Sequence, residues 1–156
     1  SLEPFFSYED RGIFIWCRSS NFGADSIQDL TLSGNKNKDV IPLYEWVARS
    51  AVQWNTRGNI GLVAGATFPR EIKVVRSHCR DMPLLIPAIG TQGGDLSNAL
   101  KYGLDVADFN VIISSSRSIL YPSNIQSKDF DQASRDAVLN LRDRINAILL
   151  EEGRRW

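Results

Sequence analysis

The sequence predicts an α/β fold built on a parallel sheet. Four short apolar runs are continuous rather than alternating, which is typical of strands covered on both faces. Each run is followed by a segment with helical spacing, so that strand and helix alternate four times along the 156 residues. Such alternation indicates a parallel sheet, either open and doubly wound or closed into a (β/α)8 barrel, and four units make half a barrel.

The expected elements follow directly from these patterns. The apolar runs predict strands over residues 12–17, 60–66, 84–90 and 109–114. The intervening segments predict helices over residues 41–54, 67–79, 95–104 and 130–152. The first of these helices repeats apolar residues at steps of three and four, which predicts one apolar face. Its members are Leu43, Tyr44, Val47, Ala48, Ala51 and Val52.

Residues suited to helix ends support these assignments. Pro69 fits the first turn of the second helix, and Thr67 just before it is a candidate cap. Asp95 is expected to cap the third helix, which Gly103 is expected to end.

Composition excludes several classes of function. Eighteen basic residues balance 18 acidic ones, and their dispersion leaves no basic patch for nucleic acid or an anionic membrane. No apolar run approaches the roughly 20 residues that span a bilayer, and the N-terminus lacks the pattern of a signal peptide. We therefore expect a cytoplasmic protein, although an opening without methionine suggests the middle of a longer polypeptide.

The cysteines and the histidine do not predict a metal or catalytic site. Cys17 and Cys79 lack the C-x-x-C spacing of zinc and redox sites, and we expect them to be reduced and buried. His78 adjoins Cys79, but adjacent residues on a helix do not face each other. We expect no metal.

The stretch AIGTQGGD, residues 88–95, leaves a predicted strand and opens a helix. Main-chain N–H groups near a helix N-terminus favour an anion, and glycines permit both positive φ angles and close approach of a phosphate. Gln92 can supply an amide donor beside Gly93 and Gly94. The alternative is a flexible turn, since short glycine patterns are weak signals.

The next predicted strand ends in SSSRSI, which places Ser116 and Arg117 at a neighbouring strand end. A guanidinium can bind phosphate through two parallel hydrogen bonds. Two consecutive loops, one rich in glycine and one bearing arginine, match the phosphate site formed after the last two strands of many (β/α)8 barrels. The competing interpretation makes Arg117 a partner in a surface ion pair.

Other polar and apolar residues are candidates for the same rim. Ser19 and Ser20 end the first predicted strand, where a hydroxyl can bind a polar heterocycle or cap the following turn. Pro87 and Ile89 can form an apolar wall, although buried strand residues are more often core.

Four motifs in register resemble one family. CRSSNFGA, GLVAGATFPREI, LLIPAIGTQGGD and SSSRSI resemble the C-terminal half of orotidine 5′-phosphate decarboxylase, in its bacterial-type branch. The resemblance covers residues 1–147 and implies that residues 1–156 form one partial domain, strands five to eight of a (β/α)8 barrel. It also implies a usually dimeric enzyme that converts orotidine 5′-monophosphate (OMP) to UMP and CO2 in pyrimidine biosynthesis without a cofactor.

The resemblance assigns roles to the rim residues. Gln92 and Arg117 would bind the substrate phosphate, with main-chain help from Gly93, Gly94 and Ser116. Ser19, or Ser20 if the alignment slides, would contact the pyrimidine, while Pro87 and Ile89 would line its pocket. One departure is Ala88, where the family usually has glycine.

The larger departure is the absence of the family's lysine and aspartate motif, D-x-K-x-x-D, from this sequence. Residues that bind the phosphate cannot replace the lysine ammonium that stabilises the developing carbanion. The chain alone is therefore expected to be inactive. The expected partner is the N-terminal half of the barrel, as a separate chain or a missing segment, and the completed enzyme is expected to be a homodimer. The alternatives are a non-catalytic half-barrel that binds a phospholigand, or another phosphate-binding barrel enzyme.

Overall fold

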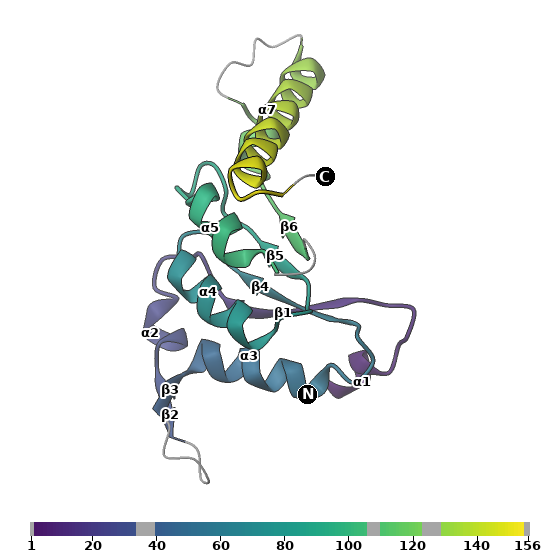
Figure 1. Cartoon of the computed structure of the whole chain (residues 1–156), viewed down its shortest axis with the longest axis vertical. Coiled ribbons are helices and arrows are strands. Elements are labelled where there is room, and N and C mark those ends of the chain that lie inside the picture. The colour runs from purple at the N-terminus through teal and green to yellow at the C-terminus, as the bar shows by residue number, and fades with distance from the viewer. Residues whose placement is uncertain (1, 34–39, 106–109, 123–128, 155–156) are drawn as a thin grey trace.

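Four parallel strands form the central sheet of the computed structural model, which describes residues 2–33, 40–105, 110–122 and 129–154 (Figure 1). In spatial order they are β1 (Ile13–Arg18), β4 (Ile60–Ala64), β5 (Leu84–Ile86) and β6 (Val111–Ile113).

The order of these strands decides between the two predicted architectures. Each strand pairs in parallel with the one before it, and each connection carries a helix. A doubly wound sheet reverses its strand order at a switch point, whereas a barrel adds strands in one direction only. The described sheet therefore has the topology of part of a (β/α)8 barrel.

Each of the four predicted helices is present. They are α3 (Leu43–Trp54), α4 (Pro69–His78), α5 (Leu96–Gly103) and α7 (Phe130–Glu151). Helices α3, α4 and α5 lie along one side of the sheet (Figure 1).

Five short elements were not expected from the sequence. They are α1 (Glu3–Phe6), α2 (Asp25–Gln28), α6 (Arg117–Leu120) and the antiparallel pair β2 (Thr31–Ser33) and β3 (Val40–Pro42). Three or four residues are too few to show a helical or alternating period. The segment between β2 and β3, residues 34–39, lies outside the described residues.

The predicted helix ends hold in part. Asp95 caps α5, because its carboxylate accepts from the Asn98 backbone N–H at 3.0 Å. Thr67 does not cap α4, and its buried hydroxyl has no partner among the described residues. Helix α5 ends at Gly103, where a β-carbon would lie 2.7 Å from Ile86 Cδ1.

The core lies between the sheet and its helices. Along β1, Ile15 and Cys17 are buried toward that layer, while Phe14 and Trp16 remain 42% and 57% exposed. Ile112 of β6 is likewise exposed, so the other face of the sheet carries uncovered apolar residues at both edges. On the apolar face of helix α3, Tyr44, Ala48 and Ala51 are buried, whereas Val52 is exposed.

A buried arginine joins the end of α5 to the segments that precede β5 and β6. Arg76 of α4 is 7% exposed, and its guanidinium donates to five backbone carbonyls, including those of Gly103, Met82 and Asn110. Burial lowers the pKa of this side chain. His78 of the same helix lies 3.0 Å from Glu45 of α3, so its contact is between helices.

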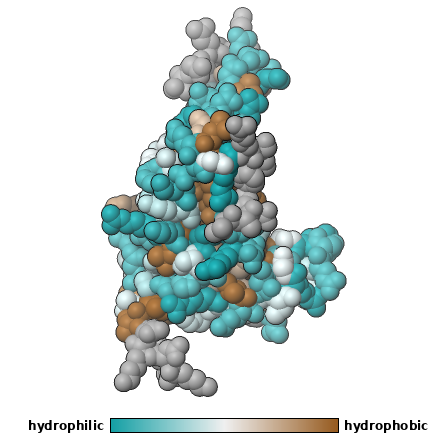
Figure 2. Space-filling view, in the orientation of Figure 1, coloured by the Kyte–Doolittle hydropathy of each residue, from teal (hydrophilic) through white to brown (hydrophobic). Residues whose placement is uncertain are grey.

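The surface seen in Figure 2 is mostly hydrophilic, with apolar residues in separate patches. No helix in the described part of the chain is both long enough and apolar enough to cross a membrane.

Candidate functional site

A small cavity opens where β5 and β6 end. Its volume is about 170 Å³, and it is lined by the two loops that follow these strands. The lining residues are Pro87, Ala88, Ile89, Thr91 and Gln92 of the first loop, and Ser114, Ser115, Ser116 and Arg117 of the second. The carboxyl ends of parallel strands are where α/β folds place their sites.

Five of the nine predicted site residues meet in this cavity: Pro87, Ile89, Gln92, Ser116 and Arg117. Gln92 and Arg117 come from neighbouring loops, and both are exposed, so the cavity presents an amide and a guanidinium to solvent. This pair can donate several hydrogen bonds to one anion. Ser116 immediately precedes the first residue of α6.

Gly93 and Gly94 do not line the cavity, and each serves the turn in a different way. Gly93 has φ +74° with open space where a β-carbon would be, whereas a β-carbon on Gly94 would lie 2.7 Å from Ala66 Cβ. The N–H of Gly93 donates to the Gly90 carbonyl at 2.9 Å, and that of Gly94 to the Ala88 carbonyl at 3.1 Å. To donate to a phosphate, as predicted, the two amides would have to give up these bonds to the Gly90 and Ala88 carbonyls.

Ala88 adopts a conformation that side chains disfavour. Its φ is +78°, in the left-handed region where a β-carbon costs about 1–2 kcal/mol. This angle gives a physical reason why a glycine would suit the position. Non-glycine residues held at such angles gather at functional sites, and this one borders the cavity.

Ser19 and Ser20 lie at the end of β1, away from the cavity lining. Ser19 is 8% exposed, and its hydroxyl accepts from the Asn21 N–H at 3.1 Å, which is the turn-capping contact. That bond uses an acceptor lone pair and leaves the O–H proton to be donated. Ser20 packs against Gly65, where a β-carbon would lie 2.7 Å from the Ser20 Cβ.

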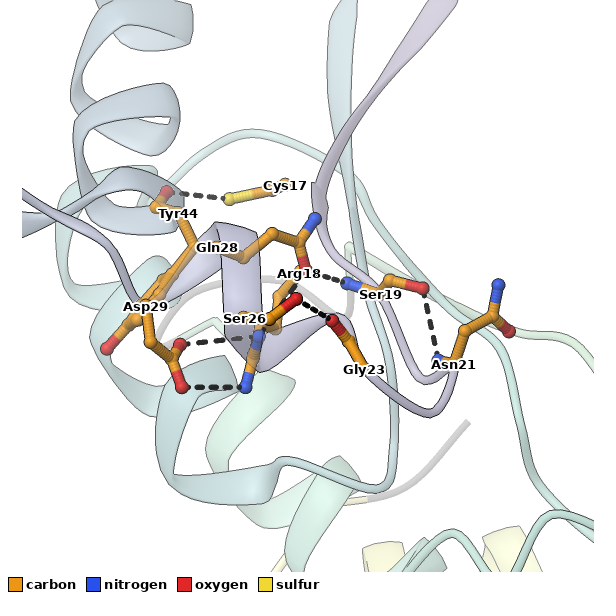
Figure 3. Close-up of polar contacts among 9 residues, drawn as sticks. All are labelled: Cys17, Arg18, Ser19, Asn21, Gly23, Ser26, Gln28, Asp29 and Tyr44. Carbon is orange, nitrogen blue, oxygen red and sulfur yellow. Dashed lines mark hydrogen bonds and ion pairs between the residues drawn. The ribbon is translucent and has the colours of Figure 1, made fainter.

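A buried arginine holds the segment that carries Ser19 (Figure 3). An irregularity in the pairing of β1 with β4 turns Arg18 toward the helices, where it is 1% exposed. It pairs with Asp29 at 3.3 Å, and it donates to Gln28 Oε1 at 3.4 Å. The same Gln28 oxygen accepts from the Ser19 N–H at 2.8 Å. Arg18 does not stand out in the sequence, because its partners Gln28 and Asp29 are 10 and 11 residues away.

Within the described residues, no group of three or more His, Cys, Asp or Glu side chains is placed to hold a metal ion.

Comparisons with known proteins identify relatives along nearly the whole chain. It is 46% identical over 147 residues to "Orotidine 5'-phosphate decarboxylase" of Cupriavidus necator, covering 94% of this chain and 51% of that protein. It is 46% identical over 152 residues to the protein of the same name from Thermomicrobium roseum, covering 97% of this chain and 52% of that one. The chain thus spans about half the length of the curated relatives it matches. No protein-family model matches it.

Two solved structures also match nearly the whole chain. The OMP decarboxylase of Leishmania donovani superposes with a TM-score of 0.77 at 34% identity, covering 95% of this chain and 52% of that one. The UMP synthase of the same organism gives a TM-score of 0.76 at 36% identity, covering 95% of this chain and 30% of that one.

Proposed function

We propose that this chain, which is homologous to about half of an orotidine 5′-phosphate decarboxylase, supplies the substrate-binding half of that enzyme. The reaction would be decarboxylation of OMP to UMP and CO2. The observation that carries the proposal is the meeting of Gln92 and Arg117, from two successive loops, in one cavity.

The size and chemistry of the cavity suit a phosphate group. Its volume of about 170 Å³ is below the roughly 300–1,000 Å³ of sites that enclose whole small molecules. A phosphate held by Arg117 and Gln92 would leave the rest of the nucleotide outside this cavity. Pro87 and Ile89 then offer an apolar wall to the ring, and Ser19 or Ser20 offers a hydroxyl to the pyrimidine amide.

The other half of the site would come from a second polypeptide segment. The relatives are about twice as long, and Phe14 and Trp16 lie exposed on the sheet face that a closed barrel would cover. Strands β1 and β6 each pair on one side within the described residues. The complementary four units would cover this face and bring the lysine and aspartate motif, and we propose that the completed enzyme is a homodimer.

Reconstitution tests this function. The 156-residue chain is mixed with the N-terminal half of the Cupriavidus necator relative, and OMP decarboxylation is followed. We expect activity from the mixture and none from either half. Arg117→Ala in the mixture should raise KM strongly, whereas Arg142→Ala, on an exposed arginine of α7, should leave KM unchanged. A mixture that binds UMP but never decarboxylates OMP would instead favour a non-catalytic phospholigand-binding protein.

A further inference from the structure

We propose that Ser115 and Ser118 are positioning residues that hold the two phosphate-binding loops together through a chain of hydroxyls. The inference rests on the proposed function, because it concerns how Gln92 and Arg117 are kept on one phosphate. Ser115 Oγ donates to the Ile89 carbonyl at 2.7 Å and lies 2.6 Å from Ser118 Oγ. We call this chain, from Ser118 through Ser115 to the Ile89 carbonyl, the hydroxyl clamp.

The direction of the bonds follows from the proton count. A carbonyl only accepts, so the single proton of Ser115 goes to Ile89. Ser118 must then donate to Ser115, which fixes both hydroxyls in one orientation. The clamp therefore runs from the first turn of α6 to the loop that follows β5.

The backbone at Gly90 fits this contact closely. Gly90 has φ +108°, and a β-carbon there would collide with Ser118 Oγ and lie 3.4 Å from Ser115 Oγ. The two loops are thus in direct contact at the clamp. Backbone pairing between the strands ends just before it, with the Ser114 N–H donating to the Ile86 carbonyl at 3.0 Å.

The clamp lies where it can set the distance between Gln92 and Arg117, the two side chains proposed to bind the phosphate. Gln92 lies two residues after Gly90, and Arg117 lies between Ser115 and Ser118 in the sequence. Ser115 and Ile89 also separate the phosphate cavity from a larger one of about 440 Å³ beside α7, since both residues line both cavities. Without the clamp, the two loops can separate, and water can enter between the side chains of Gln92 and Arg117.

Ligand titrations of the reconstituted mixture of the 156-residue chain and the N-terminal half test the clamp, using UMP and, separately, uridine, which lacks the phosphate. Ser115→Ala should weaken UMP binding about three- to tenfold, the range set by one hydrogen bond. In the same variant the dissociation constant for uridine, which has no phosphate, should change less than about twofold. Ser118→Ala should have a smaller effect, because the Ser115 bond to Ile89 remains, and adding it to Ser115→Ala should cost nothing further.

Controls separate positioning from folding. Ser115→Thr keeps the hydroxyl and should retain UMP affinity, and Ser97→Ala removes an exposed hydroxyl of α5 outside the cavity. The melting temperature of each variant shows whether it folds. If Ser115→Ala does not fold, the UMP affinity of Ser118→Ala is the test instead. Unchanged UMP affinity in both alanine variants, or equal losses for UMP and uridine, would overturn the clamp. Failure of the unaltered mixture to bind UMP, or retention of UMP by a mixture that carries Arg117→Ala, would overturn the proposed function and the clamp with it.

Discussion

The guanidinium carbon of Arg18 lies 3.9 Å from the centre of the Phe68 ring. The arginine comes from the end of β1 and the phenylalanine from the residue that precedes α4, so the contact joins two strand-to-helix connections. Because Arg18 is almost completely buried, its positive charge is stabilised by the ring and by Asp29 rather than by water.

Phe68→Leu should therefore lower the free energy of unfolding by about 1–2 kcal/mol, the range for a desolvated cation–π contact. Leucine keeps apolar bulk beside Arg18 but provides no ring. The free energy is measured by urea denaturation at neutral pH. Phe68→Tyr retains the ring and should stay close to the unaltered chain. Equal stability of the leucine and tyrosine variants would show that the ring contact contributes nothing.

The adjacent glycines should respond differently to substitution. Gly93→Ala should cost about 1 kcal/mol, because φ is positive but space is open, and Gly93→Asn should cost less. Gly94→Ala should cost about 2–3 kcal/mol, because its methyl would crowd the Ala88 carbonyl and Ala66, and Gly94→Asn should be no better. Chemical denaturation of the four variants measures these differences. The reverse order of costs would contradict the assigned conformations.

Asp95 should make stability depend on pH. The Asn98 backbone N–H, and then its side-chain amide, lower the pKa of this carboxyl in the folded chain. The carboxylate therefore contributes stability above its unfolded-state pKa of about 3.9, and that contribution is lost as pH falls through the lower folded-state pKa. Asp95→Ala should cost about 1 kcal/mol at pH 7 and progressively less below pH about 4.

Asp95→Asn is the matched control for this pH effect. Asparagine caps a helix as well as aspartate does, but it does not titrate. The variant should be nearly as stable as the unaltered chain at pH 7. Thermal unfolding measured from neutral to acidic pH distinguishes the three proteins, and a constant difference between aspartate and alanine at every pH would refute the role of the charge.

The two cysteines should resist modification in the folded chain. Burial raises the pKa of Cys17 to about 12 and that of Cys79 to about 11, and both residues are 1% exposed. Since the thiolate is the reactive form, labelling at pH 8 should be slow until denaturant is added. Mass spectrometry after timed iodoacetamide treatment measures the extent at each site. Rapid native labelling of either cysteine would place it at the surface.

Much of the fold was predictable because its signals are local. The apolar runs that became β1, β4, β5 and β6, and the helical spacing that follows them, are each readable within about a dozen residues. The prediction extended one strand too far: the run over residues 84–90 forms a strand only to Ile86. The strand stops there because Pro87 has no N–H donor and Ala88 adopts a positive φ.

The site was predictable in part for the same reason. Gln92 and Arg117 stand out in short motifs at strand ends, and the structure brings them to one cavity. Ser115 and Arg18 did not stand out, because their contacts are with Ile89 and Asp29, and neither pairing leaves a periodic signal in the sequence.

By itself, the sequence determined the parallel α/β fold class, the loops that bear the phosphate-binding candidates and the resemblance carried by four motifs, since all of these are encoded in neighbouring residues. Only the tertiary structure decided that the strands follow barrel order, that the amides of Gly93 and Gly94 are used within their own turn, and that Ser115 joins the two loops. Those features depend on which distant backbone and side-chain groups come within hydrogen-bonding distance, and chain folding sets that proximity.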